Sequence, residues 1–98
     1  MCKAVNLRSE SYDIYIGRAG KGQEGIFGNP FIVGAHGARG ECVIKFETWF
    51  KSDDADAAYM RDMVRTHIKP GMRLGCFCKP ATCHGDIIAA YVNNGYKF

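Results

Sequence analysis

Three cysteines and a histidine lie within nine positions of the segment "LGCFCKPATCHGD", residues 74–86. Thiolate sulfur and imidazole nitrogen are preferred zinc ligands, and three cysteines with one histidine complete a tetrahedral site. Cys76 and Cys78 are one residue apart, so in a strand their side chains point to the same face with Cα atoms about 7 Å apart. Two sulfurs placed in this way can converge on one ion. The segment therefore predicts a zinc site formed by Cys76, Cys78, Cys83 and His84.

The same residues also fit a reactive thiol. Cys83 stands where a helix is expected to begin, and a helix N-terminus favours the thiolate form. His84 or Asp86 can then act as the base or orient the thiol, which makes Cys83 and His84 the candidate catalytic pair. Adjacent side chains on a helix diverge by about 100°, so Cys83 and His84 bind one ion together only if one of them lies outside the helix. Otherwise His36 or a water completes the shell. A redox switch between Cys83 and a strand cysteine, and simple packing of small apolar side chains, are the remaining interpretations.

A glycine-rich stretch occupies much of the segment between residues 17 and 40. "GKGQEG", residues 20–25, has the spacing of the dinucleotide fingerprint, but Pro30 follows where that fingerprint requires a helix, so a Rossmann site is excluded. Glycines still allow backbone N–H groups to surround an anion. Basic side chains near this loop in the sequence are Arg8, Arg18, Lys21 and Arg39.

The motif "FGNPF", residues 27–31, has the residue types of a base-binding loop. Phe27 and Phe31 can enclose a flat ring between them. Asn29 precedes Pro30, which restricts it to an extended or turn conformation, so its amide can be aimed at the edge of a base. Alternatively, the two phenylalanines belong to the core and Asn29 is a turn residue.

Six elements are needed to position these motifs. Strands are expected at residues 2–7, 11–18 and 72–78, and helices at 41–52, 53–68 and 83–94. Tyr12, Ile14 and Ile16 alternate with other residues as in a strand, and Asp53 or Asp54 can cap the second helix. The first two strands are expected to form a hairpin because their connection is short. The order predicts an α/β fold: one domain over residues 1–98, a three- to four-stranded sheet covered by about three helices, and a long glycine-rich loop.

Composition limits the classes of protein that remain. The chain has 98 residues, 47% of them hydrophobic, and a net charge of +3. This charge is well below the dense basic stripe of a dedicated nucleic-acid binder, although weak contact with nucleic acid stays open. No apolar run reaches the roughly 20 residues that span a bilayer, so no membrane partner is expected. Five cysteines, an odd number, without a secretory leader indicate the reducing cytoplasm.

Four ordered motifs, "VNLR", "DIYIGR", "GIFGNPF" and "LGCFCKPATCHGD", resemble a family of small phage and bacterial proteins catalogued as domain of unknown function 4326. The resemblance covers nearly the whole chain. Phe77 stands between the strand cysteines where the family often has tryptophan. The resemblance implies a phage-type protein, and hence counter-defence or nucleotide metabolism. It also implies that one recurring constellation comprises Asn6, Arg8, Tyr15, Gly17, Arg18, Phe27, Gly28, Asn29, Pro30, Arg39, Cys76, Cys78, Cys83 and His84.

The leading functional hypothesis is a domain that binds a nucleotide-related small molecule, either to sequester or to modify it. The FGNPF loop and the adjacent cysteine and histidine residues would form the site, and zinc is a candidate cofactor. The expected ligand-binding residues are Arg8, Tyr15, Arg18, Phe27, Gly28, Asn29 and Arg39. The alternative is a non-catalytic adaptor for nucleic acid or protein with a structural zinc. The sequence leaves open whether the site is catalytic.

Overall fold

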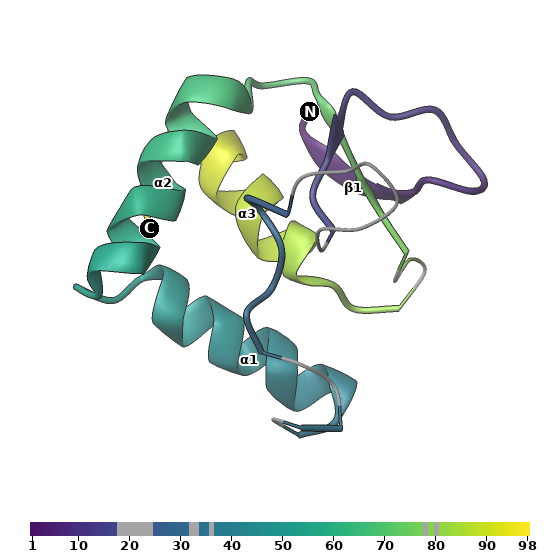
Figure 1. Ribbon diagram of the computed structural model, residues 1–98. Coiled ribbons are helices and arrows are strands. Elements are labelled where there is room, and N and C mark those ends of the chain that lie inside the picture. Colours follow the sequence, from purple (N-terminus) through teal and green to yellow (C-terminus); the bar gives the residue numbers. More distant parts are fainter. Residues whose placement is uncertain (18–24, 32–33, 36, 78, 80) are drawn as a thin grey trace.

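In the part of the chain that the structure describes, three strands and three helices form a small α/β domain (Figure 1). The computed structural model describes residues 1–17, 25–31, 34–35, 37–77, 79 and 81–98. The elements follow the order β1 (Lys3–Asn6), β2 (Ile14–Tyr15), α1 (Arg39–Phe50), α2 (Ala55–His67), β3 (Arg73–Cys76) and α3 (His84–Asn93). The predicted fold class is therefore confirmed.

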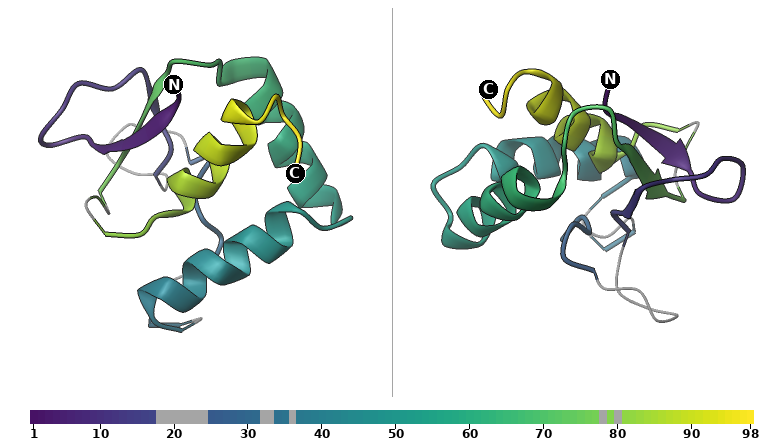
Figure 2. Two further views of the ribbon diagram at one scale, coloured as in Figure 1. Left: turned by 180° about the vertical axis from the view of Figure 1, so that it is seen from behind. Right: turned by 90° about the horizontal axis from the view of Figure 1, so that it is seen from above.

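β3 lies in the centre of the sheet, in the order β1-β3-β2. Both outer strands run parallel to β3, and Ala4 and Ile14 are opposite Leu74 on its two sides. The expected hairpin of the first two strands is wrong. A hairpin requires antiparallel neighbours, whereas β1 and β2 are separated by β3. Figure 2 shows the arrows of β1 and β3 pointing the same way.

The helices form two further layers on one side of the sheet. α3 packs directly on β1 and β3, while α1 and α2 pack on α3 and on each other. Figures 1 and 2 show α3 between the sheet and the other two helices. The close approach of α3 depends on Gly85, where an added Cβ would lie 2.5 Å from Ile16 Cδ1 and 3.0 Å from Ala4 Cβ. The sheet face that carries Ala4 and Ile16 is therefore the helix-covered face.

The connection from β1 to β2 covers part of the opposite face. It places the ring of Tyr12 against Gly75, where an added Cβ would lie only 2.6 Å from Tyr12 Cγ. Val5, opposite Gly75 in the register, is buried on this face. The face without helices is thus shielded in part by an aromatic side chain.

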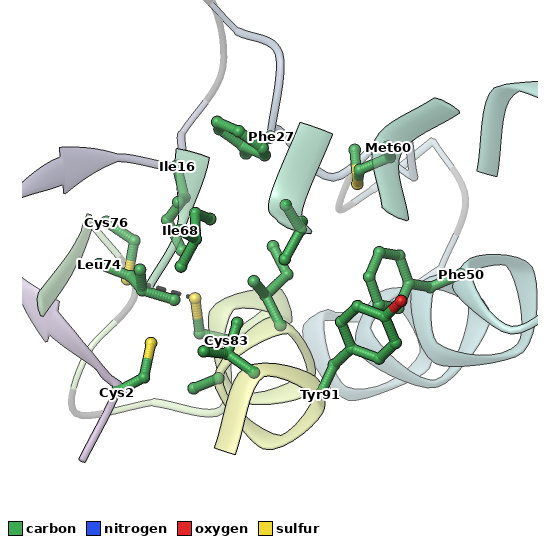
Figure 3. Packing of buried hydrophobic residues seen from close by; sticks show 14 of the residues in the cluster. Cys2, Ile16, Phe27, Phe50, Met60, Ile68, Leu74, Cys76, Cys83 and Tyr91 are labelled. Carbon is green, nitrogen blue, oxygen red and sulfur yellow. Dashed lines mark hydrogen bonds between the residues drawn. The ribbon is translucent and has the colours of Figure 1, made fainter. Parts of the chain in front are cut away.

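The core contains an aromatic stripe along α1. Val43, Phe46 and Phe50 of α1 are buried, and the rings of Phe46 and Phe50 are stacked with centroids 5.4 Å apart. Tyr91 of α3 meets Phe50 edge to face (Figure 3). The predicted helix cap is also confirmed, because the Asp54 carboxylate accepts two backbone N–H groups at the start of α2.

Candidate site at the carboxyl ends of the strands

The carboxyl ends of three parallel strands meet at one edge of the sheet. Asn6, Tyr15 and Cys76 are the last residues of β1, β2 and β3. The N-terminus of α3 reaches the same edge, since Cys83 Sγ lies 3.2 Å from Cys76 Sγ. Ligands of open parallel sheets bind outside such edges. The sequence motifs at strand ends and at the start of α3 are therefore brought together.

Residues at this edge divide between the two faces of the sheet. Side chains alternate along a strand, so Cys76 shares the helix-covered face with Ile16, while Tyr15 is on the opposite face with Gly75. Phe77 follows this alternation. Its ring meets Tyr15 edge to face at 6.3 Å, and the ring is about half exposed, at 49%. The edge thus has an aromatic side and a sulfur side.

Arg8 completes the aromatic side. Its guanidinium carbon lies 5.0 Å from the centre of the Phe77 ring, a cation–π distance. Asn6 holds the chain for this contact: its Oδ1 accepts the N–H of Arg8 at 2.9 Å, and its Nδ2 donates to Lys79 O at 2.7 Å. The loops that follow β1 and β3 are thereby joined. We call Arg8, Tyr15 and Phe77 the aromatic–arginine cluster.

On the sulfur side, Cys83 caps α3. Its Sγ accepts the N–H of Gly85 at 3.3 Å, while the carboxylate of Asp86 accepts the N–H of Cys83 at 3.2 Å. These reciprocal bonds form a capping box with cysteine in the place of serine or threonine. Both Cys76 and Cys83 are buried (Figure 3).

A cation lies beside the two sulfurs. Lys79 Nζ forms an ion pair with Asp86 Oδ1 at 2.6 Å. The hydrogen bond to Asp86 raises the pKa of Lys79, burial opposes this change, and negative charge on Cys83 and Cys76 would raise the pKa further. The Lys79–Asp86 pair therefore places a positive charge in the same electrostatic environment as the two sulfurs.

His84 connects this edge to the FGNPF loop. Its Nε2 lies 2.8 Å from Ile16 O and 2.9 Å from Phe27 O, and its Nδ1 lies 3.7 Å from Cys83 Sγ. Both partners of Nε2 are carbonyl oxygens, so Nε2 carries the proton and donates it. Only Nδ1 faces the sulfurs. Phe27 is itself buried in the core, as the alternative interpretation of the motif expected.

Asn29 is held by the chain around it. Its Nδ2 donates to Cys42 O at 3.3 Å and its Oδ1 accepts the N–H of Phe31 at 2.9 Å. Phe31 packs edge to face on Trp49 at 6.5 Å, and Gly28 closes the tight turn before Asn29. These contacts fasten the loop to α1. The ligand-binding role of the loop stays a prediction.

Other predicted residues lie away from the edge or outside the described residues. Arg39 is the first residue of α1, which packs on α2 and α3 but on none of the three strands described. Arg18 and Cys78 lie outside the described residues. Within the described ranges, no group of three or more metal-ligating side chains comes together. Of the four predicted zinc ligands, Cys76 and Cys83 therefore have their sulfurs in contact. His84 presents Nδ1 to the sulfur of Cys83, and Cys78 is not described.

Phe77 and Lys79 are the residues that the sequence interpretation missed. Phe77 was noted only as a substitute for tryptophan, although its position two residues after Gly75 predicts the same face as that glycine. Lys79 lies in a turn between β3 and α3. Its pairing with Asp86 depends on the position of α3, and no local spacing indicates it.

Comparisons with known proteins identify the family of this chain. Residues 2–94 match the family described as Domain of unknown function (DUF4326). A protein of Enterobacteria phage T4, described as "Uncharacterized 12.4 kDa protein in nrdA-td intergenic region", is 36% identical over 99 residues, which cover 99% of this chain and 82% of that protein. No solved structure matches the chain. None of the described helices is long and apolar enough to cross a membrane. The chain belongs to the DUF4326 family.

Proposed function

We propose that this domain binds a nucleotide-related ligand, with a flat base and a phosphate, at the aromatic–arginine cluster. The observation that carries the proposal is the position of Arg8 over the half-exposed ring of Phe77, with Tyr15 against its edge. A base can stack on Phe77 and on the guanidinium plane, and base stacking contributes about 1–3 kcal/mol. Arginine also presents the fork of donors that suits phosphate.

The position of the cluster supports the same ligand class. It lies at the carboxyl edge of a parallel sheet, where the loops after β1 and β3 are joined through Asn6. A shallow open depression of about 380 Å³ lies along β1 and the loops at its end, lined by Ala4, Val5, Asn6, Ser9, Glu10 and Lys79. It shares Asn6 with the hydrogen bonds that hold the loop of Arg8, but no residue of the cluster lines it. In this proposal the FGNPF loop does not contact the ligand. It supports the site through the hydrogen bond between His84 and Phe27 O, which holds the loop against the start of α3.

Binding is better supported than modification of the ligand. Cys83 Sγ is buried on the helix-covered side of β3, whereas Phe77 is on the opposite face. A ligand stacked on Phe77 would therefore have β3 between it and the candidate nucleophile. We propose sequestration of the ligand in the cytoplasm, in a role such as counter-defence or nucleotide metabolism.

Titration calorimetry of Phe77→Ala and Arg8→Ala with a nucleotide panel tests the proposal. The controls are Tyr59→Ala and Arg65→Ala, an exposed aromatic residue and an exposed arginine of α2. We expect each cluster variant to weaken binding by about 10-fold or more and each control to leave it unchanged. Parallel titrations with mononucleotides and with single-stranded oligonucleotides separate the two sources of this chemistry. Equal affinity of Phe77→Ala and the wild type would overturn the proposal.

A structural zinc in a non-catalytic adaptor is the second candidate. The observation that favours it is the contact between the sulfurs of Cys76 and Cys83, because two neighbouring thiolates are half of a tetrahedral shell. Cys78 would supply a third sulfur. His84 could contribute only through Nδ1 while Nε2 donates to the two carbonyls. Metal analysis of purified protein tests this candidate: one zinc per chain and unfolding on chelation would support it.

A further inference from the structure

The sulfurs of Cys76 and Cys83 are close enough to form a covalent bond after a small movement. They lie 3.2 Å apart and share a hydrogen bond (Figure 3). A disulfide bond is about 2.05 Å long, so closure requires an approach of about 1.1 Å. Cys76 ends β3 and Cys83 caps α3, and both positions are at the end of an element, where a shift of this size is least restricted.

The geometry around Cys83 distinguishes it from Cys76. The Cys83 sulfur stands at the N-terminus of a ten-residue helix and accepts the N–H of Gly85. Lys79 is paired with Asp86 in the first turn of the same helix. Cys76 ends the neighbouring strand with its sulfur in contact with that of Cys83, so it is placed as the second thiol that can react with an oxidised Cys83.

We propose that Cys76 and Cys83 form a dithiol site that hydroperoxides oxidise to a disulfide. The Cys83 thiolate attacks one peroxide oxygen, the O–O bond breaks, and Cys83 becomes a sulfenic acid while the other oxygen leaves as water or an alcohol after taking a proton. The Cys76 thiolate then attacks the Cys83 sulfur, the S–S bond forms, and the S–O bond breaks with loss of water. Two thiols lose two electrons in total and the peroxide gains them. A dithiol reductant then returns the Cys76–Cys83 disulfide to two thiols and is itself oxidised to a disulfide.

The low exposure of both sulfurs limits the size of the oxidant that can reach them. Cys76 and Cys83 are each 1% exposed, so bulky disulfides cannot reach them in the folded state, whereas hydrogen peroxide is nearly as small as water. We therefore expect hydrogen peroxide to oxidise the pair while oxidised glutathione reacts slowly. This site is separate from the aromatic–arginine cluster, and its test uses no nucleotide.

Mass spectrometry of the reduced protein after treatment with hydrogen peroxide tests the inference. The expected product is lighter than the reduced chain by two hydrogen atoms. Chymotryptic cleavage after Phe77 separates Cys76 from Cys83, so a disulfide between them links two peptides. Cys42→Ser, in α1, should still form this product. Cys76→Ser should instead stop at the Cys83 sulfenic acid, which a dimedone adduct reports.

Cys83→Ser should neither form the disulfide nor give the adduct. Serine is a preferred N-cap residue, so this variant keeps the cap of α3, and far-UV circular dichroism will verify that it is folded. Three results would overturn the inference: loss of the product in Cys42→Ser, unreacted thiols in the wild type after peroxide treatment, or one zinc per chain that protects the cysteines from peroxide.

Discussion

His84 joins three segments through one ring. It begins α3, its Nε2–H is shared between Ile16 O after β2 and Phe27 O in the FGNPF loop, and its ring packs edge to face on Phe46 at 5.2 Å. A buried carbonyl without a donor costs free energy, so the ring stabilises the conformation of both loops at once. The imidazole that could be taken for a catalytic base is thus a central element of local structure.

His84→Leu should therefore lower the free energy of unfolding by about 2 to 4 kcal/mol, because two buried carbonyls lose their donor. His84→Gln should lose less, since the glutamine amide nitrogen can take the position of Nε2. Urea denaturation measures both values. His67→Leu, at an exposed position near the end of α2, is the control and should change stability by less than about 0.5 kcal/mol. Equal losses in the Leu and Gln variants of His84 would contradict this role.

β2 has only two residues, so its position depends on contacts in addition to its backbone pairing with β3. Asp13, just before β2, accepts the N–H of Arg73 at 2.8 Å and contacts the Arg73 guanidinium at 3.4 Å. In return, the N–H of Asp13 donates to Arg73 O at 2.9 Å. The hydrogen bonds from the backbone and side chain of Arg73 lower the pKa of the Asp13 carboxyl group. The start of β2 is thereby fixed to the start of β3.

The lowered pKa of Asp13 predicts a dependence of stability on pH. A carboxyl group with a lower pKa in the folded state stabilises the fold above its unfolded pKa, about 3.9, and this contribution is lost as the pH falls through the folded pKa. Asp13→Asn should melt below the wild type at pH 7, and the difference should shrink below about pH 4. Melting curves followed by circular dichroism between pH 7 and pH 2 measure it. The control is Asp53→Asn, in the exposed connection between α1 and α2; a constant difference for Asp13→Asn across this range would contradict the assignment.

At the scale of the whole molecule, one side chain fastens the first strand to the last helix. Asn93 Oδ1 accepts the N–H of Cys2 at 2.9 Å, and Asn93 Nδ2 donates to Cys2 O at 2.8 Å, across 91 positions of sequence. The amide thus imitates a neighbouring strand at the start of β1. Burial raises the pKa of the Cys2 thiol and the nearby N-terminus opposes this change, so Cys2 is best suited to remain a neutral core residue.

Asn93→Ala should lower the free energy of unfolding by about 1 to 2 kcal/mol, because two backbone groups of Cys2 lose their partner. Asn94→Ala is the matched control: Asn94 is exposed and donates only locally to Lys97 O. Urea denaturation of the two variants gives the comparison. The fastening role fails if both alanine variants have the stability of the wild type.

Local signals predicted the helices and part of the core. Asp54 caps α2 through bonds within three residues, and the stripe of Phe46 and Phe50 follows from helical spacing alone. The pairing of β1 with β3 was not predictable in this way, since Lys3 and Arg73 are opposite each other and no local pattern joins them. The hairpin prediction failed for this reason.

In the candidate site, too, local features were predictable from the sequence and contacts between distant residues were not. The cysteines were found from their spacing, because the turn between Cys76 and Cys83 is short. The structural role of Asn29 depends on the backbone of Cys42 in another element, and the cation–π contact of Arg8 depends on Phe77, which follows a strand distant in sequence. The residue types of Asn29 and Arg8 indicated that their side chains take part in polar contacts. Only the tertiary structure identifies Cys42 and Phe77 as their partners.

A ribosome releases β1 and β2 well before it has made β3, which begins at Arg73. Among the described strands, β1 and β2 each pair only with β3, so the emerging chain has no template on which to build its sheet. Contacts between residues this distant in sequence slow folding, and exposed strand edges invite association with other chains. The sheet therefore forms late in synthesis, and a nascent chain that stalls before Arg73 presents two unpaired strands to the chaperones of the cell.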